Sequence, residues 1–527
     1  MKRAVFLDRD GTINVDRGYV HRREDFAFLP GAVDALRKLQ DAGYLLILIT
    51  NQSGIGRGMF TETEYLVFQD WISEALRRQG VYLTAQYYCP HVDEDYCDCR
   101  KPRMGLFERA ARELDIDWNE SYAIGDRLRD LSVCEKYGVR GYLVGDTETD
   151  VEKLPDGVKR VTDLAEAANE IAVKPYYIFG AHSRAQTTAT YIRKLHPDWG
   201  LLGFLFDDDE RNPDCILGHP VLDLRADCEL DTSARVYLGI RGVGFAHATE
   251  ALQAAGFTDI VPVDVELDRN LRMQYMKLAF AEQEREFALL ENLPAYGTGV
   301  NAQIGIAHAL GDGALKNTPG LKPEETYVQA GTSLDGEQAA DCRFYDNDGE
   351  NISNKNRQFC ELTVLYWLWK NCSSEWIGLE HYRRRFILPE DWTARLGQVD
   401  AILPVPLYVY PSLEGNFVAR HKKQVWEMAI QILSEQHPDM QEAATEFFSK
   451  QGCYSPCNML IARREVLDNL CSWLFPMLFD LEGRVGMLED SYQNRYPGFV
   501  SERFISFFFW YYRDKYNVVY SEKNFLS

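Results

Sequence analysis

The chain has 527 residues, several times the length of a typical domain, so we expect more than one domain. Its 57 lysines and arginines against 80 aspartates and glutamates give a formal net charge of −23, which excludes a protein that binds nucleic acid through bulk positive charge. Hydrophobic residues make up 46% of the sequence, which excludes a disordered chain and predicts large buried cores.

The sequence predicts a cytoplasmic protein without an integral membrane segment. No apolar run reaches the roughly 20 residues that a membrane helix needs. The first residues lead directly into a strand-like segment and show no signal-peptide core. Among the 12 cysteines, Cys89, Cys97 and Cys99 form one cluster, which in a reducing compartment indicates a metal site rather than a disulfide framework.

Residues 1–172 alternate strand-like and helix-like segments. The expected strands are 4–7, 44–50, 122–124 and 141–144, and the expected helices are 31–42 and 61–79. Thr61 and Glu64 form a capping-box pattern at the start of the second helix. This alternation predicts an α/β domain with a parallel sheet, whose chemistry gathers at the carboxyl ends of the strands.

Two further regions follow the first domain. Residues 176–290 predict a smaller Rossmann-like module with a connecting helix, and residues 291–527 form a third domain that is richer in Trp and Tyr. The middle module, with Gly180 after a strand, is similar to the small module in front of bacterial sugar acyltransferases, which implies nucleotide-sugar binding. A packing or adaptor role is an equally good interpretation, and the acidic run 207–210 is more typical of a solvated loop than of a metal site.

A pair of aspartates follows the first expected strand. Asp8 and Asp10 are separated by one residue, and Gly11 allows the chain to turn sharply after them. Such a pair suits phosphoryl transfer, because one carboxylate can attack phosphorus while the other handles the leaving-group proton. Taken alone, the pair is equally well interpreted as turn residues after a strand.

Other strand ends supply groups that complete this chemistry. Asp126 follows a later strand, with Asp130 one helical turn further on, and hard oxygen ligands of this kind favour Mg²⁺. Thr50 offers a hydroxyl and Lys101 a cation for a phosphate group.

These elements, in this order, resemble the four motifs of the haloacid-dehalogenase (HAD) phosphatase superfamily. The resemblance implies a phosphoaspartyl mechanism with Asp8 as nucleophile and Asp10 as general acid and base, assisted by Thr50 and Lys101. It also implies Mg²⁺ held by Asp8, the backbone carbonyl of Asp10, and Asp126.

A polar loop between two of these motifs carries four metal-ligand residues. Cys89, His91, Cys97 and Cys99 lie within 11 residues as one C-x-H and one C-x-C pair, which fits tetrahedral Zn²⁺ with no open position. Such a zinc ion is structural. By closing the loop it would fix Arg100 and Lys101, which follow Cys99 directly. Free cysteines beside a hydrogen-bonded histidine are the weaker alternative.

The motifs also resemble those of the D-glycero-D-manno-heptose-1,7-bisphosphate 7-phosphatases, with the histidinol-phosphate phosphatases as nearest relatives. Arg127 departs from that pattern, because the family usually has a lysine there. The resemblance implies that substrate is bound by Asp16, Arg17, Gly18, Tyr19, Asn51, Gln52, Ser53, Arg57, Arg100 and Arg127, besides Thr50 and Lys101.

The third domain carries a polar loop before an aromatic helix and a Glu-His-Tyr-Arg-Arg motif at an expected strand end. Together with the shorter segments 400–404, 457–460 and 499–503, these resemble an uncharacterised glycosyltransferase-like family from capsule and O-antigen gene clusters. The resemblance implies a GT-A-like α/β fold and a nucleotide-sugar donor. Asp346 and Asp348 are candidates for a divalent-cation site, although a turn is the better interpretation of that pair. The candidate transferase residues are Asp346, Asp348, Glu380, His381, Arg383, Arg384 and Glu502.

The sequence as a whole predicts a bifunctional bacterial enzyme of surface-polysaccharide synthesis. A Mg²⁺-dependent, zinc-stabilised sugar-phosphate phosphatase would be joined to a glycosyltransferase. Two alternatives remain open: a phosphatase acting on histidinol phosphate, and a C-terminal domain that binds sugar without catalysis.

Overall fold

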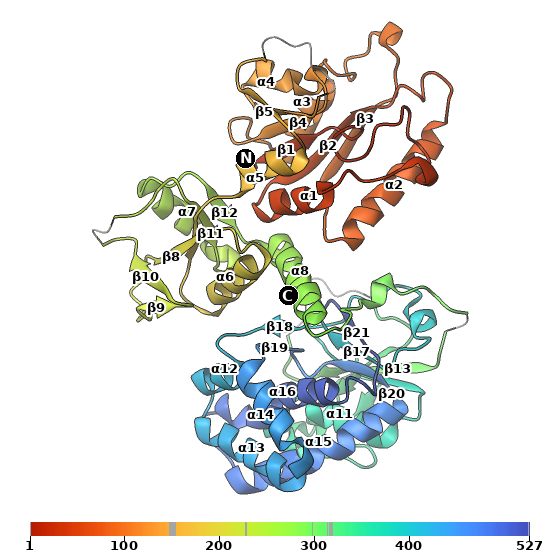
Figure 1. Cartoon of the computed structure of the whole chain (residues 1–527). Helices are drawn as coiled ribbons and strands as arrows, with labels where there is room; N and C mark the ends of the chain where they lie inside the picture. The colour runs from red at the N-terminus through yellow and green to blue at the C-terminus, as the bar shows by residue number, and fades with distance from the viewer. Residues whose placement is uncertain are drawn as a thin grey trace. The chain divides into compact units, whose positions relative to one another are not determined.

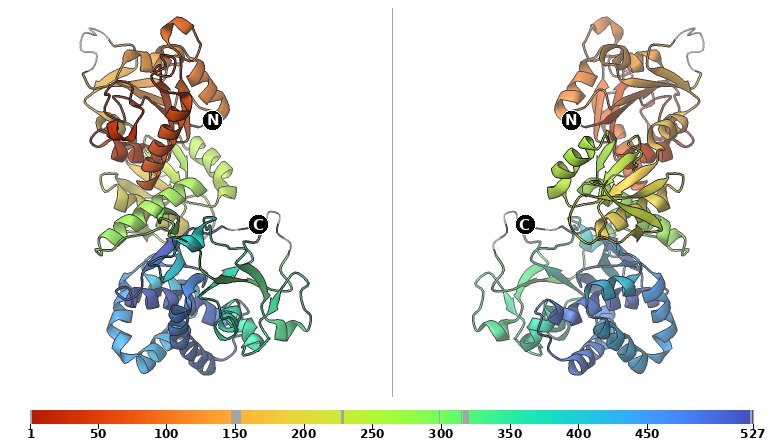
Figure 2. Two further views of the ribbon diagram at one scale, coloured as in Figure 1. Left: turned by 90° about the vertical axis from the view of Figure 1, so that its right-hand side faces the viewer. Right: turned by 90° about the vertical axis from the view of Figure 1, so that its left-hand side faces the viewer.

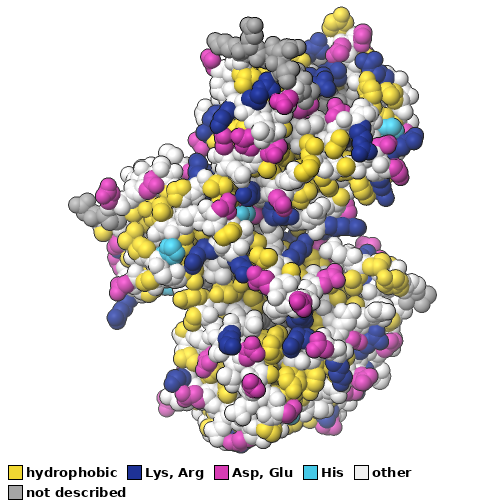
Figure 3. All heavy atoms as spheres, in the orientation of Figure 1, with side chains coloured by type: hydrophobic (Ala, Val, Ile, Leu, Met, Phe, Trp, Pro, Cys, Tyr) yellow, Lys and Arg dark blue, Asp and Glu magenta, His cyan; other side chains and the backbone are white. Residues whose placement is uncertain are grey.

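The computed structural model describes residues 2–146, 154–226, 229–297, 299–313, 315, 320–524 and 526. The chain forms two compact units, Met1–Tyr275 and Met276–Ser527 (Figure 1). Within the described ranges, no helix is both long and apolar enough to cross a membrane. Basic and acidic side chains are interspersed over the face shown in Figure 3.

The first sheet is parallel throughout, with strand order β3-β2-β1-β4-β5-β6. Its strands are β1 (Ala4–Leu7), β2 (Leu45–Asn51), β3 (Ala85–Cys89), β4 (Tyr122–Gly125), β5 (Arg140–Val144) and β6 (Val158–Val161). Its helices are α1 (Ala32–Asp41), α2 (Glu62–Arg78), α3 (Gly105–Leu114), α4 (Ser132–Tyr137) and α5 (Leu164–Ala172).

Helices cover both faces of this sheet. Apolar side chains of α3 and α4 share one buried core with those of β1, β2 and β4, while α1 lies beside α5 (Figure 1). The expected capping box forms at the start of α2, where the Thr61 hydroxyl accepts from the Glu64 amide and the Glu64 carboxylate accepts from the Thr61 amide.

The second sheet of this unit has the order β12-β11-β7-β8-β10-β9, with only β9 and β10 antiparallel. Its strands are β7 (Tyr176–Phe179), β8 (Leu201–Phe206), β9 (Cys215–Ile216), β10 (His219–Asp223), β11 (Arg235–Leu238) and β12 (Ile260–Pro262). The accompanying helices are α6 (Ser183–Leu195), α7 (Phe245–Ala254) and α8 (Val265–Ala281).

The acidic run 207–210 in this module is engaged in ion pairs. Asp209 pairs with Arg225 at 2.7 Å, and Glu210 with His182 at 2.7 Å. Both pairs are exposed, so the run lies at the surface.

The second unit is built on a mixed sheet with the order β15-β14-β13-β16-β20-β17-β21, in which β20 is antiparallel to its neighbours. The strands are β13 (Ala302–His308), β14 (Glu325–Gln329), β15 (Phe344–Tyr345), β16 (Trp376–His381), β17 (Ala401–Pro404), β20 (Leu460–Arg463) and β21 (Val518–Ser521), and β18 (Leu407–Tyr408) pairs with β19 (Cys453–Tyr454).

Helices α9 (Thr332–Asp335), α10 (Asn356–Phe359) and α11 (Leu362–Asn371) follow the first strands of this sheet. The later helices α12 to α16 pack on one another (Figure 2). They are α12 (Leu413–Arg420), α13 (Lys423–Gln436), α14 (Gln441–Lys450), α15 (Arg464–Val485) and α16 (Tyr496–Tyr511).

The predicted α/β fold class is confirmed. The division into 1–172, 176–290 and 291–527 stays a prediction. Its first boundary falls between α5 and β7, but the second compact unit begins at Met276, inside α8, rather than at 291.

Candidate active site

The first candidate site lies where β1 and β4 end. The two strands are parallel neighbours with Leu7 opposite Ile124, so Asp8 and Asp126 follow them at the same edge of the sheet. Asp130, in the 3-10 turn after β4, completes a group of three buried carboxylates whose ligand oxygens lie within 4.8 Å of one another.

Two glycines allow these carboxylates to approach. A Cβ atom on Gly125 would lie 2.4 Å from the Cβ of Asp130, and one on Gly11 would lie 2.5 Å from Asp126 Oδ2. Gly11 also has a φ of +83°, which L side chains rarely adopt. A side chain at either glycine would therefore displace one of the acids.

Lys101 is the cation of this site. Its Nζ donates to Asp8 Oδ1 at 2.6 Å and to the carbonyl of Ile49 at 2.6 Å, and it lies 2.7 Å from Asp130 Oδ1. Asn51 fixes the Lys101 backbone, because its amide donates to the Lys101 carbonyl at 3.1 Å and accepts from the Lys101 N–H at 3.0 Å. The ammonium is thereby held between two of the three carboxylates.

The site is short of positive charge. Burial raises the pKa of Asp8 to about 7 although Lys101 lies beside it, and the carboxylates of Asp130 and Asp10 add to the rise. Burial, with Asp130 nearby, also raises the pKa of Asp126 to about 6. Three carboxylates facing one ammonium, all with hard oxygen donors, fit a divalent cation such as Mg²⁺.

Asp10 is held apart from this group by other donors. Asn14 Nδ2 donates to Asp10 Oδ1 at 3.0 Å, and Gln52 Nε2 donates both to Asp10 Oδ2 at 3.1 Å and to Thr50 Oγ1 at 2.9 Å. Arg9 is buried and also donates to the Asp10 carboxylate. Arg9 and Asn14 are not among the sequence candidates, and their positions in the Asp8 motif are the signal that could have identified them.

The loop 16–19 is joined to the acids by Arg127. The guanidinium lies 3.5 Å from Asp16 Oδ2 and 3.7 Å from Asp126 Oδ2. Asp16 also accepts from the Gly18 N–H at 2.8 Å. Arg17 and Tyr19 are exposed on the same loop.

The remaining substrate candidates are placed differently. Ser53 is half-buried and its carbonyl accepts from the N–H of exposed Arg57 at 3.0 Å. Arg100 is engaged within its own loop, because its guanidinium donates to Asp93 at 2.5 Å and to the His91 carbonyl at 3.3 Å. The structure therefore ties Arg100 to the cysteine loop rather than to the acids.

The four predicted metal ligands of that loop converge. The Sγ atom of Cys99 lies 3.3 Å from that of Cys89, 3.4 Å from that of Cys97, and 3.3 Å from His91 Nδ1. Two thiolates bound tetrahedrally at ~2.3 Å would be about 3.8 Å apart, so these side chains need to move by only a few tenths of an ångström to share one ion.

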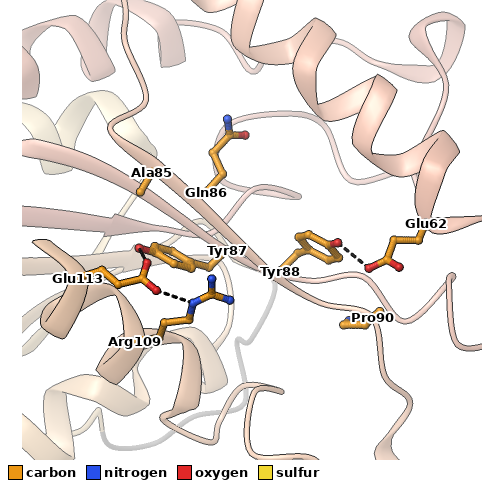
Figure 4. Close-up of a pocket in the computed structure, with 8 residues that line it drawn as sticks. All are labelled: Glu62, Ala85, Gln86, Tyr87, Tyr88, Pro90, Arg109 and Glu113. Atoms are coloured by element: carbon orange, nitrogen blue, oxygen red, sulfur yellow. Dashed lines mark hydrogen bonds and ion pairs between the residues drawn. The ribbon is translucent and has the colours of Figure 1, made fainter.

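A separate groove of about 550 Å³ runs along the edge strand β3 (Figure 4). In it, the Tyr88 hydroxyl donates to Glu62 at 2.6 Å and the Tyr87 hydroxyl to Glu113 at 2.8 Å, while Arg109 pairs with Glu113. None of its lining residues belongs to the acid group or to the four metal-ligand side chains.

In the second unit, Asp346 and Asp348 do not form a cation site. The Asp346 carboxylate is fully buried and accepts from the N–H groups of Gly331 (2.7 Å) and Thr332 (3.0 Å). The hydroxyls of Ser353 (2.5 Å) and Thr363 (2.6 Å) also donate to it. Asp348 is exposed. The Asp346 oxygens thus already tie loops to α11, which favours the turn interpretation of this pair over a divalent-cation site.

Glu380 and His381 point away from each other, as neighbours on a strand must. Glu380 is buried, accepts from the Phe386 N–H at 2.7 Å, and lies 3.7 Å from Arg385. Burial, with Glu325 nearby, raises its pKa to about 8. Arg383 is exposed and its guanidinium lies over the Tyr382 ring. Glu380 and Arg383 thus do not share a pocket with His381.

His381 belongs to a second candidate site. Its Nε2 is buried with no hydrogen-bond partner among the described residues and lies 4.0 Å from Glu361 Oε1. Burial lowers the pKa of His381, and the charge of Arg384 adds to this shift. Burial raises the pKa of Glu502 although Arg503 and Arg384 oppose the rise. Glu361 is not among the sequence candidates, although it directly precedes the aromatic helix α11.

The loop before β20 closes this second site. Glu502 Oε1 accepts from the Cys457 N–H at 2.7 Å, and Asn458 Nδ2 donates to Glu361 Oε1 at 2.7 Å. Cys457 and Asn458 both have positive φ, +77° and +52°. Strained backbone of this kind is found mainly at functional sites.

Comparison with known proteins identifies the first domain. The D-glycero-beta-D-manno-heptose-1,7-bisphosphate 7-phosphatase of Haemophilus ducreyi is 51% identical over 146 residues, 26% of this chain and 80% of the relative. That of Pasteurella multocida is 41% identical over 189 residues, 35% of this chain and 100% of the relative. The chain belongs to this phosphatase family. The predicted relationship to heptose-bisphosphate phosphatases is confirmed.

Two family models match parts of the same domain. Residues 3–130 match the model described as polynucleotide kinase 3 phosphatase, and residues 98–171 match the HAD-hydrolase-like model. A heptose 1,7-bisphosphate phosphatase of B. bronchiseptica, complexed with magnesium and phosphate, is 34% identical and covers 32% of this chain and 97% of its own, with a TM-score of 0.31.

The second unit matches a family without an assigned function. Residues 321–514 match a domain of unknown function, DUF4422. The bifunctional glycosyltransferase WbbM, in its apo structure, is 21% identical and covers 43% of this chain and 45% of its own, with a TM-score of 0.39.

Proposed function

We propose that residues 1–172 hydrolyse the 7-phosphate of D-glycero-D-manno-heptose 1,7-bisphosphate or of a related sugar phosphate. The observation that carries the proposal is the buried group of Asp8, Asp126 and Asp130 around Lys101 at the ends of β1 and β4. The names of the relatives supply the substrate class.

In this mechanism an Asp8 oxygen attacks phosphorus, an Asp8–phosphate bond forms, and the bond from phosphorus to the sugar oxygen breaks. Asp10, oriented by Asn14 and Gln52, gives the leaving oxygen its proton. Asp10 then takes a proton from water, which attacks the aspartyl phosphate and releases phosphate with Asp8 regenerated.

Lys101 has two functions in these steps. Its contact with Asp8 orients the nucleophile, and its charge offsets the negative charge of the phosphate oxygens. Mg²⁺ held by Asp8, the carbonyl of Asp10, and Asp126, with Asp130 beside them, would neutralise charge on the transferred phosphoryl group.

We propose that Cys89, His91, Cys97 and Cys99 hold a structural Zn²⁺. Four protein ligands leave no open position, so the ion stabilises the loop and does not act on substrate. Lys101 follows two residues after Cys99, so loop closure positions its ammonium. Reduced thiolates in this role also support a cytoplasmic location.

A phosphate-release assay of the full chain tests the substrate. With Mg²⁺ present, we expect kcat/KM for heptose 1,7-bisphosphate to exceed that for histidinol phosphate by at least about 100-fold, which is about 2.7 kcal/mol of transition-state discrimination. The 1-phosphate should remain on the product. Equal or reversed preference would reject the heptose assignment and leave the phosphatase chemistry standing.

We propose that residues 291–527 act as a glycosyltransferase on a nucleotide-sugar donor in surface-polysaccharide synthesis. The supporting observation is the buried group at the end of β16, where His381 Nε2 lies 4.0 Å from Glu361 Oε1 and the adjoining residues Cys457 and Asn458 contact Glu502 and Glu361. A buried imidazole or carboxylate can take the acceptor hydroxyl proton as the new glycosidic bond forms. The guanidinium of Arg384 suits the departing nucleoside diphosphate.

The test is nucleotide release by the full chain with a panel of nucleotide sugars and acceptor saccharides. We expect His381→Ala to lower the rate by about 100-fold or more, because one positioned proton acceptor contributes 10²–10⁴-fold. His437→Gln, outside this group, should leave the rate unchanged. Donor binding without turnover in the wild type would favour the non-catalytic sugar-binding alternative.

A further inference from the structure

A third group of potential metal ligands lies in the second unit, on the strand next to the one that carries His381. His308 ends β13, and Asp341 and Cys342 lie in the loop between α9 and β15. Their ligand atoms lie within 4.8 Å of one another, and His308 Nε2 is 3.7 Å from Asp341 Oδ2. Two segments more than 30 residues apart thus bring a nitrogen, an oxygen and a sulfur donor together.

The His308 ring is packed between other rings, but one of its nitrogen atoms lacks a hydrogen-bond partner among the described residues. The rings of Tyr327 and Tyr382 pack edge-on against it, with centroids 5.6 and 5.4 Å away. The His308 carbonyl accepts from the Ala330 N–H at 2.8 Å, which fixes the backbone. Its Nδ1 is buried and has no hydrogen-bond partner among the described residues. Buried polar atoms are nearly always paired, so this one calls for an explanation.

The position of the group favours a ligand. β13 is parallel to both β14 and β16, so His308 lies at the carboxyl ends of three adjacent parallel strands. Ligands of α/β sheets bind at that edge. Cys342 is buried, whereas Asp341 is exposed, so one ligand would come from the interior and one from the surface.

We propose that His308, Asp341 and Cys342 bind one divalent transition-metal ion of the Zn²⁺ class. A mixed imidazole, carboxylate and thiolate set suits Zn²⁺ or Co²⁺, whereas Mg²⁺ prefers oxygen ligands alone. Three protein ligands leave a fourth position open, as in zinc sites that accept an exogenous oxygen ligand. A simple His308–Asp341 ion pair is the competing explanation, and it gives Cys342 no part.

Cobalt titration of the metal-stripped, reduced full chain tests this site. Because we also propose a metal ion at the Cys89 loop, the titration uses a Cys97→Ser/Cys99→Ser background. We expect one equivalent of Co²⁺ to give a sulfur-to-cobalt charge-transfer band, which Co²⁺ bound to the carboxylates of Asp8, Asp126 and Asp130 cannot give. His308→Ala and Cys342→Ser should each weaken Co²⁺ binding by more than about 100-fold, since losing a ligand should cost more than the 10- to 100-fold typical of an outer-shell partner.

Two further variants distinguish the loss of a metal ligand from misfolding. Asp341→Asn changes an exposed side chain and should weaken Co²⁺ binding while the circular dichroism spectrum stays the same. Cys372→Ser, a buried cysteine outside the group, should bind Co²⁺ like the background. Absence of the band in the background, or an affinity unchanged by Asp341→Asn and Cys342→Ser, would overturn the proposal. Neither readout depends on phosphatase or transferase activity.

Discussion

Asp8→Asn should abolish phosphate release while the protein stays folded. The amide cannot form the aspartyl phosphate, so we expect kcat to fall by at least about 10³-fold with every sugar phosphate tested. Folding should persist, because Lys101 keeps its bonds to the Ile49 carbonyl and to Asp130. The measurement is steady-state phosphate release with Mg²⁺, together with a thermal melt.

The melts should also show a specific pH dependence. The folded-state pKa of Asp8 is about 7, above its ordinary value of 3.8, so the native state binds this proton more tightly than the unfolded chain does. The contribution of protonated Asp8 to the free energy of unfolding is fully present below pH 4 and is lost as the pH rises through 7. Without added Mg²⁺, Asp8→Asn should therefore melt higher than wild type at pH 8, and the difference should shrink at pH 5.

Asp34→Asn is the matched control. Asp34 lies exposed on α1 of the same domain, so its loss should change neither kcat nor the pH dependence of melting. Phosphate release by Asp8→Asn within tenfold of the wild-type rate would contradict the nucleophile assignment. A variant that is both inactive and unfolded would be replaced by Asp8→Glu, which keeps the charge but moves the attacking oxygen.

The first site could be predicted largely because its residues follow strands. Residues after parallel strands must meet at one sheet edge, so Asp8 and Asp126 are brought together by topology alone. Arg100 could not be placed in this way. Its partner Asp93 lies in the same irregular loop, and no periodicity indicates the direction of either side chain.

In the second unit, the sequence alone predicts less about where the candidate side chains lie. An Asp-x-Asp pattern does not reveal whether a carboxylate faces solvent or its own backbone, and Asp346 faces four protein donors. The pairing of His381 with Glu361, and of His308 with Asp341, depends on how separate elements pack. Neither pair has a spacing that a single sequence could expose.

Cys99→Ser should remove one zinc ion per chain and most of the phosphatase activity. Residues 90–99 of the loop are largely polar and half-buried or exposed, so its apolar contacts alone cannot hold its shape. Lys101 lies two residues beyond Cys99 and reaches Asp8 at 2.6 Å, so a loosened loop displaces the ammonium from the nucleophile. We expect kcat/KM to fall by about 10- to 100-fold, in line with a misplaced positioning group.

Zinc content by mass spectrometry and kinetics on the same sample separate this effect from simple destabilisation. Cys134→Ser is the control, because Cys134 is a buried cysteine of the same core that lies outside the loop. It should lower the melting temperature through a buried hydroxyl, yet keep its zinc and its kcat/KM. If Cys99→Ser kept both zinc and activity, the four side chains would be a reduced cysteine cluster, and Lys101 would be held by Asn51 and the acids alone.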